Sequence, residues 1–268
     1  MISGETPMIS VSGLYYRQPG SLWKSFFQPK YILEDISFSL QEGESLAVIG
    51  EERSGKSELI AAIAGIINPS KGRIFLYDQD IATHQRFRSQ NVRMVFQNPI
   101  SGLNQRLRVY DILQIPLLIT GGLSRQEREE RIRDVLNLVD LTWDIGNMYP
   151  SSLSQGQLKR VAFARALILN PKIILANRAA SAFDPNLRSR ICNMLIRLHK
   201  ERKICSIIAT SDLDIARHIC DKILVLNKGK VVEFGPMVKI LSNPQSEITA
   251  RLIANYNNEY RYDPDRNV

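Results

Sequence analysis

The sequence predicts an α/β fold with a P-loop, a mostly parallel sheet and an inserted helical region. Residues 50–57 read Gly-Glu-Glu-Arg-Ser-Gly-Lys-Ser and match the phosphate-binding pattern G-x-x-x-x-G-K-S at every fixed position. Apolar runs typical of buried strands alternate with helical patterns before and after residues 101–152. Residues 101–152 are themselves dominated by helical periodicity, which predicts an insert in the sheet domain.

The P-loop pattern stands between a predicted strand and a predicted helix. Residues 45–49 form a short apolar run, and apolar residues recur at helical spacing after Ser57. In this arrangement backbone amides and the helix N-terminus bind phosphate. We expect Lys56 to reach the terminal phosphates of a nucleotide and Ser57 to offer its hydroxyl group to Mg²⁺. The nucleotide-binding residues predicted in this segment are Gly50, Ser54, Gly55, Lys56 and Ser57.

Strand and helix patterns divide the chain into four predicted regions. Residues 8–100 form an N-terminal β subdomain with the P-loop core, and residues 101–152 form the helical subdomain. Residues 153–256 return to alternating strands and helices and complete the α/β core. Residues 257–268 form a polar tail. No internal repeat is apparent in the sequence.

The composition predicts a cytosolic globular protein. The chain has 268 residues, enough for one large or two modest domains, and a moderate net charge of +8. No run approaches the ~18 apolar residues of a membrane span, and the N-terminus lacks an export signal. We attribute the charge to a solvated basic exterior and expect no nucleic-acid partner. Cys192, Cys205 and Cys220 lack metal-ligand spacing and are expected to be small buried apolar side chains.

The order of the remaining motifs is specific. After the P-loop come Met94–Pro99, then Leu153–Gln157 at the start of a basic helix, then an apolar strand, and then Ser181–Asp184. This order resembles the ATP-binding subunits of ATP-binding-cassette (ABC) transporters over residues 11–254. Within that family, residues 97–104 are similar to the segment after the glutamine loop of peptide importers.

The resemblance implies a P-loop nucleotide-binding cassette, with a RecA-like α/β core, an antiparallel β subdomain and an inserted helical subdomain. It implies ATP and Mg²⁺ as ligands, and a place at the cytoplasmic face of a bacterial inner membrane. The implied partners are a sister ATP-binding subunit, two membrane permease subunits and, indirectly, an extracytoplasmic peptide-binding protein.

Residue roles also follow from the resemblance. Tyr16 resembles the aromatic residue that stacks on adenine; Tyr15 is a rival, and a half-buried strand tyrosine is the alternative. Gln97 resembles the glutamine that contacts the metal or the attacking water, so that Ser57 and Gln97 are the implied metal ligands. Asp184 resembles the aspartate that links the two sites of a cassette dimer. The implied signature, which closes over the ATP of the partner cassette, comprises Leu153, Ser154, Gln155, Gly156 and Gln157.

Three catalytic positions depart from the family pattern, so that no catalytic residue is intact. Asn177 replaces the aspartate at the strand end, Arg178 replaces the neighbouring glutamate, and Ser211 replaces a later histidine. Mg²⁺ prefers carboxylate oxygens, so an amide holds it weakly. Loss of the general base lowers the rate by about 10²–10⁴. In addition, Arg53 stands where the family usually has a loop glycine.

These features suggest an asymmetric pair in a peptide transporter. The chain is expected to lend its signature to a competent sister cassette, while its own site binds nucleotide with little turnover. One alternative is an ordinary hydrolysing cassette in which Asp212 or Glu58 replaces the lost carboxylate. Another is a soluble ABC-type regulator or scaffold that never docks on a permease.

Overall fold

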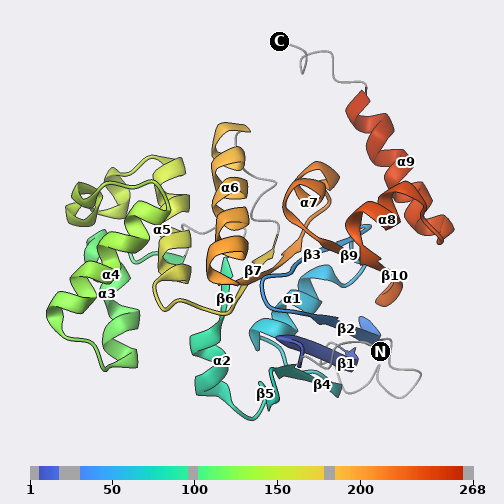
Figure 1. Ribbon diagram of the computed structural model, residues 1–268, viewed down its shortest axis with the longest axis horizontal. Coiled ribbons are helices and arrows are strands. Elements are labelled where there is room, and N and C mark those ends of the chain that lie inside the picture. The colour runs from blue at the N-terminus through green and yellow to red at the C-terminus, as the bar shows by residue number, and fades with distance from the viewer. Residues whose placement is uncertain (1–5, 18–30, 96–101, 178–184, 262–268) are drawn as a thin grey trace, which may run out of the picture.

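The computed structural model describes residues 6–17, 31–95, 102–177 and 185–261, with the side chains of 185–188 and 257–261 excepted. Figure 1 shows a helical region at the left and an antiparallel sheet at the lower right, with a larger sheet between them. Among the described residues, none of the helices has the length and apolar character that a membrane crossing requires.

The smaller sheet is antiparallel and has the strand order β2-β1-β4-β5. Its strands are β1 (Ile9–Tyr16), β2 (Leu33–Leu40), β4 (Lys71–Leu76) and β5 (Gln79–Asp80). Buried residues in β2 alternate with less buried ones, as expected for a sheet that packs on one face. The predicted antiparallel β subdomain is therefore confirmed.

The larger sheet has the strand order β10-β9-β3-β8-β7-β6. Its strands are β3 (Ser45–Gly50), β6 (Val92–Val95), β7 (Ile173–Asn177), β8 (Cys205–Ala209), β9 (Lys222–Asn227) and β10 (Lys230–Pro236). All neighbouring strands are parallel except β10, which runs antiparallel to β9. The carboxyl ends of β3, β7 and β8 therefore meet at one edge, where parallel α/β sheets bind their ligands.

Two hydrophobic clusters cover the opposite faces of the larger sheet. Ala47 and Ile49 of β3 belong to the cluster that includes the helical region, whereas Leu46 and Val48 belong to the one that includes the antiparallel sheet. The sheet is buried on both sides, which explains why its strands read as continuous apolar runs.

The helices around the sheets are α1 (Lys56–Ala64), α2 (Gln85–Asn91), α5 (Gln155–Leu167), α6 (Pro185–Arg202), α7 (Leu213–Ile219), α8 (Met237–Ser242) and α9 (Glu247–Arg261).

The helical region contains α3 (Val109–Thr120), α4 (Arg125–Leu138), and the short 3₁₀ helices η2 (Trp143–Asn147) and η3 (Pro150–Ser152). Ser124 and Glu127 form a capping box that satisfies backbone amides at the start of α4.

The boundaries of the four regions predicted from the sequence stay predictions. At the other end of the chain, α9 continues to Arg261, inside the segment predicted as a polar tail.

A buried histidine connects α6 to the larger sheet. His199 is 8% exposed, and its Nε2 lies 2.8 Å from Ser206 Oγ of β8. Burial lowers the pKa of His199 below its ordinary value of 6.5, although the carboxylate of Asp221 opposes this shift. The folded protein therefore keeps this imidazole neutral at a pH at which an unfolded chain already takes up a proton.

We expect the free energy of unfolding to fall as the pH falls below about 6.5, by at most about 1.4 kcal/mol per pH unit from this group. Above that pH the contribution of His199 is fully present, because both states leave the imidazole neutral. Urea denaturation between pH 8 and pH 5 measures the effect. His199→Gln should flatten this part of the profile, since the exposed His84 and His218 remain as a background common to both proteins. Identical pH slopes in wild type and variant would contradict the assignment.

Candidate nucleotide site

The P-loop connects the carboxyl end of β3 to the start of α1. Gly55 caps α1 with a φ of 104°, and a Cβ atom there would lie 2.7 Å from a methyl group of Leu33. At Gly50 a Cβ atom would collide with the carbonyl oxygen of Leu226. The amide of Gly229, in the turn between β9 and β10, donates to Ser54 O at 3.0 Å. The two fixed glycines of the motif are therefore required by close packing against the neighbouring backbone.

Lys56 lies inside the loop that it closes. Its side chain is buried, and Nζ donates to the carbonyl oxygens of Gly50 and Glu51, each at 2.7 Å, and to Ser54 Oγ at 3.2 Å. These contacts hold a positive charge at the concave side of the loop, beside the N-terminus of α1. This arrangement suits the phosphate groups of a nucleotide.

A cavity of about 240 Å³ opens along the P-loop, lined by residues 52–58. Its charged side chains are those of Glu52, Arg53, Lys56 and Glu58. Arg53 adopts a left-handed backbone conformation with a φ of 59°, which is unfavourable for a residue with a Cβ atom by about 1–2 kcal/mol. The loop thus places an arginine where the family usually has glycine. The cavity lining carries two cations and two carboxylates.

The strand tips next to the loop carry neutral groups at two of the departing positions. Asn177 ends β7, and its Oδ1 accepts a hydrogen bond from Ser57 Oγ at 3.3 Å. Ser211 follows β8 and lines a second cavity, of about 210 Å³, together with Gly50 and Glu51. The sheet therefore places positions 177 and 211 at the carboxyl ends of β7 and β8, on the same side of β3, although their side chains cannot act as a base at neutral pH.

Asp212 has another role in this structure. Its carboxylate is buried and accepts from the amides of Asp214 at 3.0 Å and Ile215 at 3.1 Å, so that it caps the N-terminus of α7. The hydroxyl group of Tyr256 donates to the same carboxylate oxygen at 3.1 Å. Asp212 is therefore held in place as the cap of α7.

The fit to Mg²⁺ is poor among the described residues. Ser57 and Asn177 offer a hydroxyl and an amide oxygen, both neutral, whereas Mg²⁺ favours carboxylates. No group of three His, Cys, Asp or Glu side chains in the described part of the chain is arranged to hold a metal ion. Gln97, the other predicted ligand, lies outside the described residues, as do Arg178 and Asp184.

The predicted signature begins α5. Ser154 is the N-cap: its Oγ accepts from the amide of Gln157 at 3.3 Å, and its own amide donates to Gln157 Oε1 at 2.9 Å. Leu153 is buried and anchors the turn, whereas Ser154 and Gln155 are exposed and Gly156 is half-buried. The positive end of a 13-residue helix thus faces outward, where an anionic group can approach it.

The residues predicted to contact adenine lie in β1. Tyr16 is half-buried in β1 and packs against the hydrophobic cluster of the antiparallel sheet. Tyr15 meets Tyr31 edge to face with ring centroids 5.2 Å apart, and Lys71 Nζ lies 5.7 Å from its ring centroid. Neither Tyr15 nor Tyr16 lines the cavity at the P-loop.

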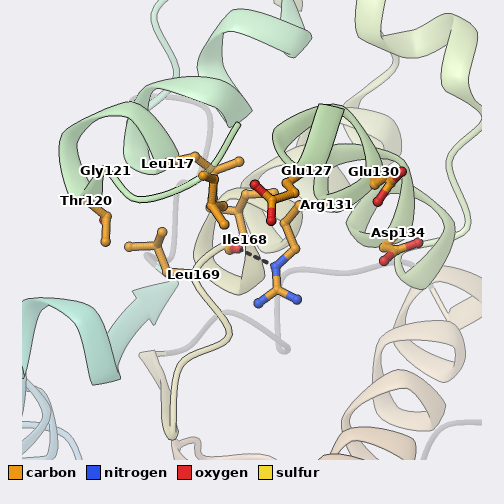
Figure 2. A pocket seen from close by; sticks show the side chains of 10 residues that line it. Leu117, Thr120, Gly121, Glu127, Glu130, Arg131, Asp134, Ile168 and Leu169 are labelled. Atoms are coloured by element: carbon orange, nitrogen blue, oxygen red, sulfur yellow. Dashed lines mark hydrogen bonds between the residues drawn. The ribbon is translucent and has the colours of Figure 1, made fainter. Parts of the chain in front are cut away.

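A groove lies in the helical region, with a volume of about 480 Å³ (Figure 2). Its residues come from α3, α4, the turn between them and the residues just after α5: Leu117, Thr120, Gly121, Leu123, Glu127, Glu130, Arg131, Asp134, Ile168 and Leu169. Arg131 Nε donates to Ile168 O at 3.1 Å, which joins α4 to α5 across the groove. Leu118 and Ile119, on the adjoining turn of α3, are 53% and 79% exposed.

Residues 33–180 match the family model described as ABC transporter. The chain belongs to the ABC transporter family. SapF of Escherichia coli K12, described as a putrescine export system ATP-binding protein, is 39% identical over 225 residues, which is 84% of each chain. DppF of the same strain, described as a dipeptide transport ATP-binding protein, is 34% identical over 238 residues, covering 86% of this chain and 71% of DppF.

The solved ABC cassettes confirm the fold. The dimeric MJ0796 cassette with bound ADP and phosphate has a TM-score of 0.74 and is 26% identical, covering 86% of this chain and 99% of that one. The predicted P-loop cassette, with its α/β core, antiparallel β subdomain and inserted helical subdomain, is thereby confirmed, as is the resemblance to the ATP-binding subunits of ABC transporters.

Proposed function

We propose that this ABC protein is an ATP-binding subunit of a peptide transporter, in which it binds ATP at its own P-loop but hydrolyses it slowly. It pairs with a catalytically competent sister cassette and lends that sister its signature. The pair docks on two permease subunits at the cytoplasmic face of a bacterial inner membrane. An extracytoplasmic peptide-binding protein delivers the cargo to the permease.

One observation carries this proposal. The tip of β7 offers Ser57 the amide of Asn177, 3.3 Å away, at the position where a hydrolysing cassette has an aspartate followed by a glutamate. The nearby Asp212 is committed to the cap of α7. Phosphate can therefore be bound by the loop amides and Lys56, whereas activation of a water molecule lacks its base.

The signature supports the second half of the proposal. Ser154 and Gln157 form a complete capping box, so the start of α5 is rigid, and Ser154 remains exposed. The N-terminus of α5, capped and exposed, is preorganised for the γ-phosphate that a facing cassette holds. The chain thus combines a binding surface for the ATP of its partner with an altered strand tip in its own site.

The helical-region groove is the surface proposed for docking on the permease. It combines the apolar Leu117 and Leu123 with the exposed Ile119 at its margin. Exposed apolar residues gathered around a concavity are typical of surfaces that a partner covers. Peptide is the cargo class we propose, because SapF of Shigella flexneri and DppF of E. coli are both described as peptide or dipeptide transport proteins.

A nucleotide titration of the purified full chain, with magnesium or with EDTA, tests the proposed site. We expect saturable ATP binding that changes less than about threefold when the metal is removed, because the described donors around Ser57 are neutral. Lys56→Ala is the control, and it should abolish binding since it removes the cation from the loop. Rapid, magnesium-dependent phosphate release by the isolated wild-type chain would contradict the proposal.

A further inference from the structure

The C-terminal helix α9 reaches the P-loop from the far end of the sequence. The carboxylate of Glu233, in β10, accepts hydrogen bonds from the amides of Gln245 at 3.0 Å and Ser246 at 3.2 Å, which fixes the start of the helix. Leu252 and Tyr256 pack against the hydrophobic cluster that includes the helical region. The helix is therefore anchored at its beginning and along one face, and its course past the loop is defined.

Two side chains of α9 contact segments that frame the nucleotide site. Arg251 Nη2 lies 3.5 Å from Glu51 Oε1, in the P-loop. The hydroxyl group of Tyr256 contacts the carboxylate of Asp212 at 3.1 Å and the amide of Asp214 at 3.2 Å, next to Ser211. Both α9 and the P-loop line the cavity of about 210 Å³ that contains Ser211.

The charges on the P-loop indicate the effect of the contact between Arg251 and Glu51. Glu51, Glu52 and Glu58 place three carboxylates on the loop and the first turn of α1, against the two cations Arg53 and Lys56. A triphosphate approaching this loop is repelled by each carboxylate that has no counter-charge nearby. Arg251 supplies a third cation, next to the carboxylate of Glu51.

We propose that α9 completes the nucleotide site, with Arg251 as the counter-charge of Glu51 and Tyr256 as a positioning residue for the loop that contains Ser211. This inference rests on the proposed nucleotide binding at the P-loop and adds the part of the chain that regulates it. A change in the position of α9 would therefore change the affinity of the P-loop for nucleotide.

Titration of the full chain with trinitrophenyl-ATP tests the role of Arg251. Arg251→Gln should weaken binding about fivefold at 10 mM salt, and the difference should shrink at 150 mM salt because the charges are exposed. Lys239→Gln, on the neighbouring helix α8, removes the same charge from an exposed residue that lines neither cavity, and it should leave binding unchanged. The double variant Glu51→Gln and Arg251→Gln should regain most of the affinity.

The outcomes separate this inference from the proposed function. If wild type binds and Arg251→Gln behaves like Lys239→Gln, the inference about α9 is overturned while nucleotide binding stands. If wild type binds no nucleotide, both are overturned. A salt-independent loss in Arg251→Gln that the double variant does not recover indicates a purely structural contact and also overturns the electrostatic role.

Hydrogen exchange tests Tyr256 independently of affinity. Tyr256→Phe keeps the ring in the hydrophobic cluster but removes the hydroxyl group that contacts Asp212. We expect faster amide exchange at residues 210–215, and unchanged exchange in β3. Unchanged exchange at residues 210–215 would remove Tyr256 from the proposal.

Discussion

Ser154→Arg should abolish ATP hydrolysis by the assembled transporter, lowering its steady-state rate by at least about a hundredfold. In the proposed pair the hydrolysed ATP lies in the sister cassette, and the start of α5 closes over its γ-phosphate. Arginine cannot replace the N-cap hydroxyl group, and its long side chain occupies the space that the phosphate needs. The measurement is phosphate release by the purified complex of both cassettes with the permease.

Two further variants separate this effect from misfolding and from loss of the chain's own site. Ser154→Asp retains a good N-cap, so that α5 should fold normally, but its negative charge repels the phosphate and should also abolish hydrolysis. Lys56→Ala disables the P-loop of this chain and should change the rate of the complex by less than about twofold, because that site turns over little. The reverse ranking, with Lys56→Ala more damaging than Ser154→Arg, would show that this chain is the hydrolysing partner.

Restoring the family residues should create ATPase activity in the isolated chain. The triple variant Asn177→Asp, Arg178→Glu and Ser211→His returns a metal ligand, a general base and a histidine to the positions at which the family has them. We expect magnesium-dependent phosphate release to rise by about 10²–10⁴, the range typical of a positioned base. Asn177 lies within hydrogen-bonding distance of Ser57, so an aspartate at position 177 could bind the same metal ion as the Ser57 hydroxyl group.

Two controls define this result. Lys56→Ala in the triple variant should return phosphate release to the background, because the new base then has no bound nucleotide to act on. Glu58→Gln in wild type tests whether the carboxylate on α1 already serves as a base. If wild type hydrolyses ATP as fast as the triple variant and loses that activity with Glu58→Gln, the site is an ordinary one with a relocated carboxylate.

Features set by local sequence were predictable. The P-loop glycines, the strand before them and the cap of α5 follow from fixed spacings, because each depends on contacts within a few residues. Asn177 lies close to Ser57 because β3 and β7 belong to one parallel sheet and end at the same edge. Periodicity alone did not predict which strand lies next to which.

Contacts between distant segments were not predictable from spacing. Arg251 and Glu51 are far apart in sequence, and neither position carries a motif that signals the other. The groove of the helical region likewise depends on how α3, α4 and α5 pack. The position of Tyr16 in a strand followed from alternation, but its packing against the core depends on the neighbouring strands.

The three buried cysteines make this chain suitable for site-specific labelling. Cys192, Cys205 and Cys220 are all the cysteines it has, and each lies in the interior. Burial raises the pKa of Cys205 to about 12 and also raises the pKa of Cys220, so that little reactive thiolate forms in the folded state. A single cysteine introduced on the surface would therefore react selectively with a fluorescent or spin probe. Distances from this protein to its neighbours in the proposed membrane complex could then be followed without first removing native thiols.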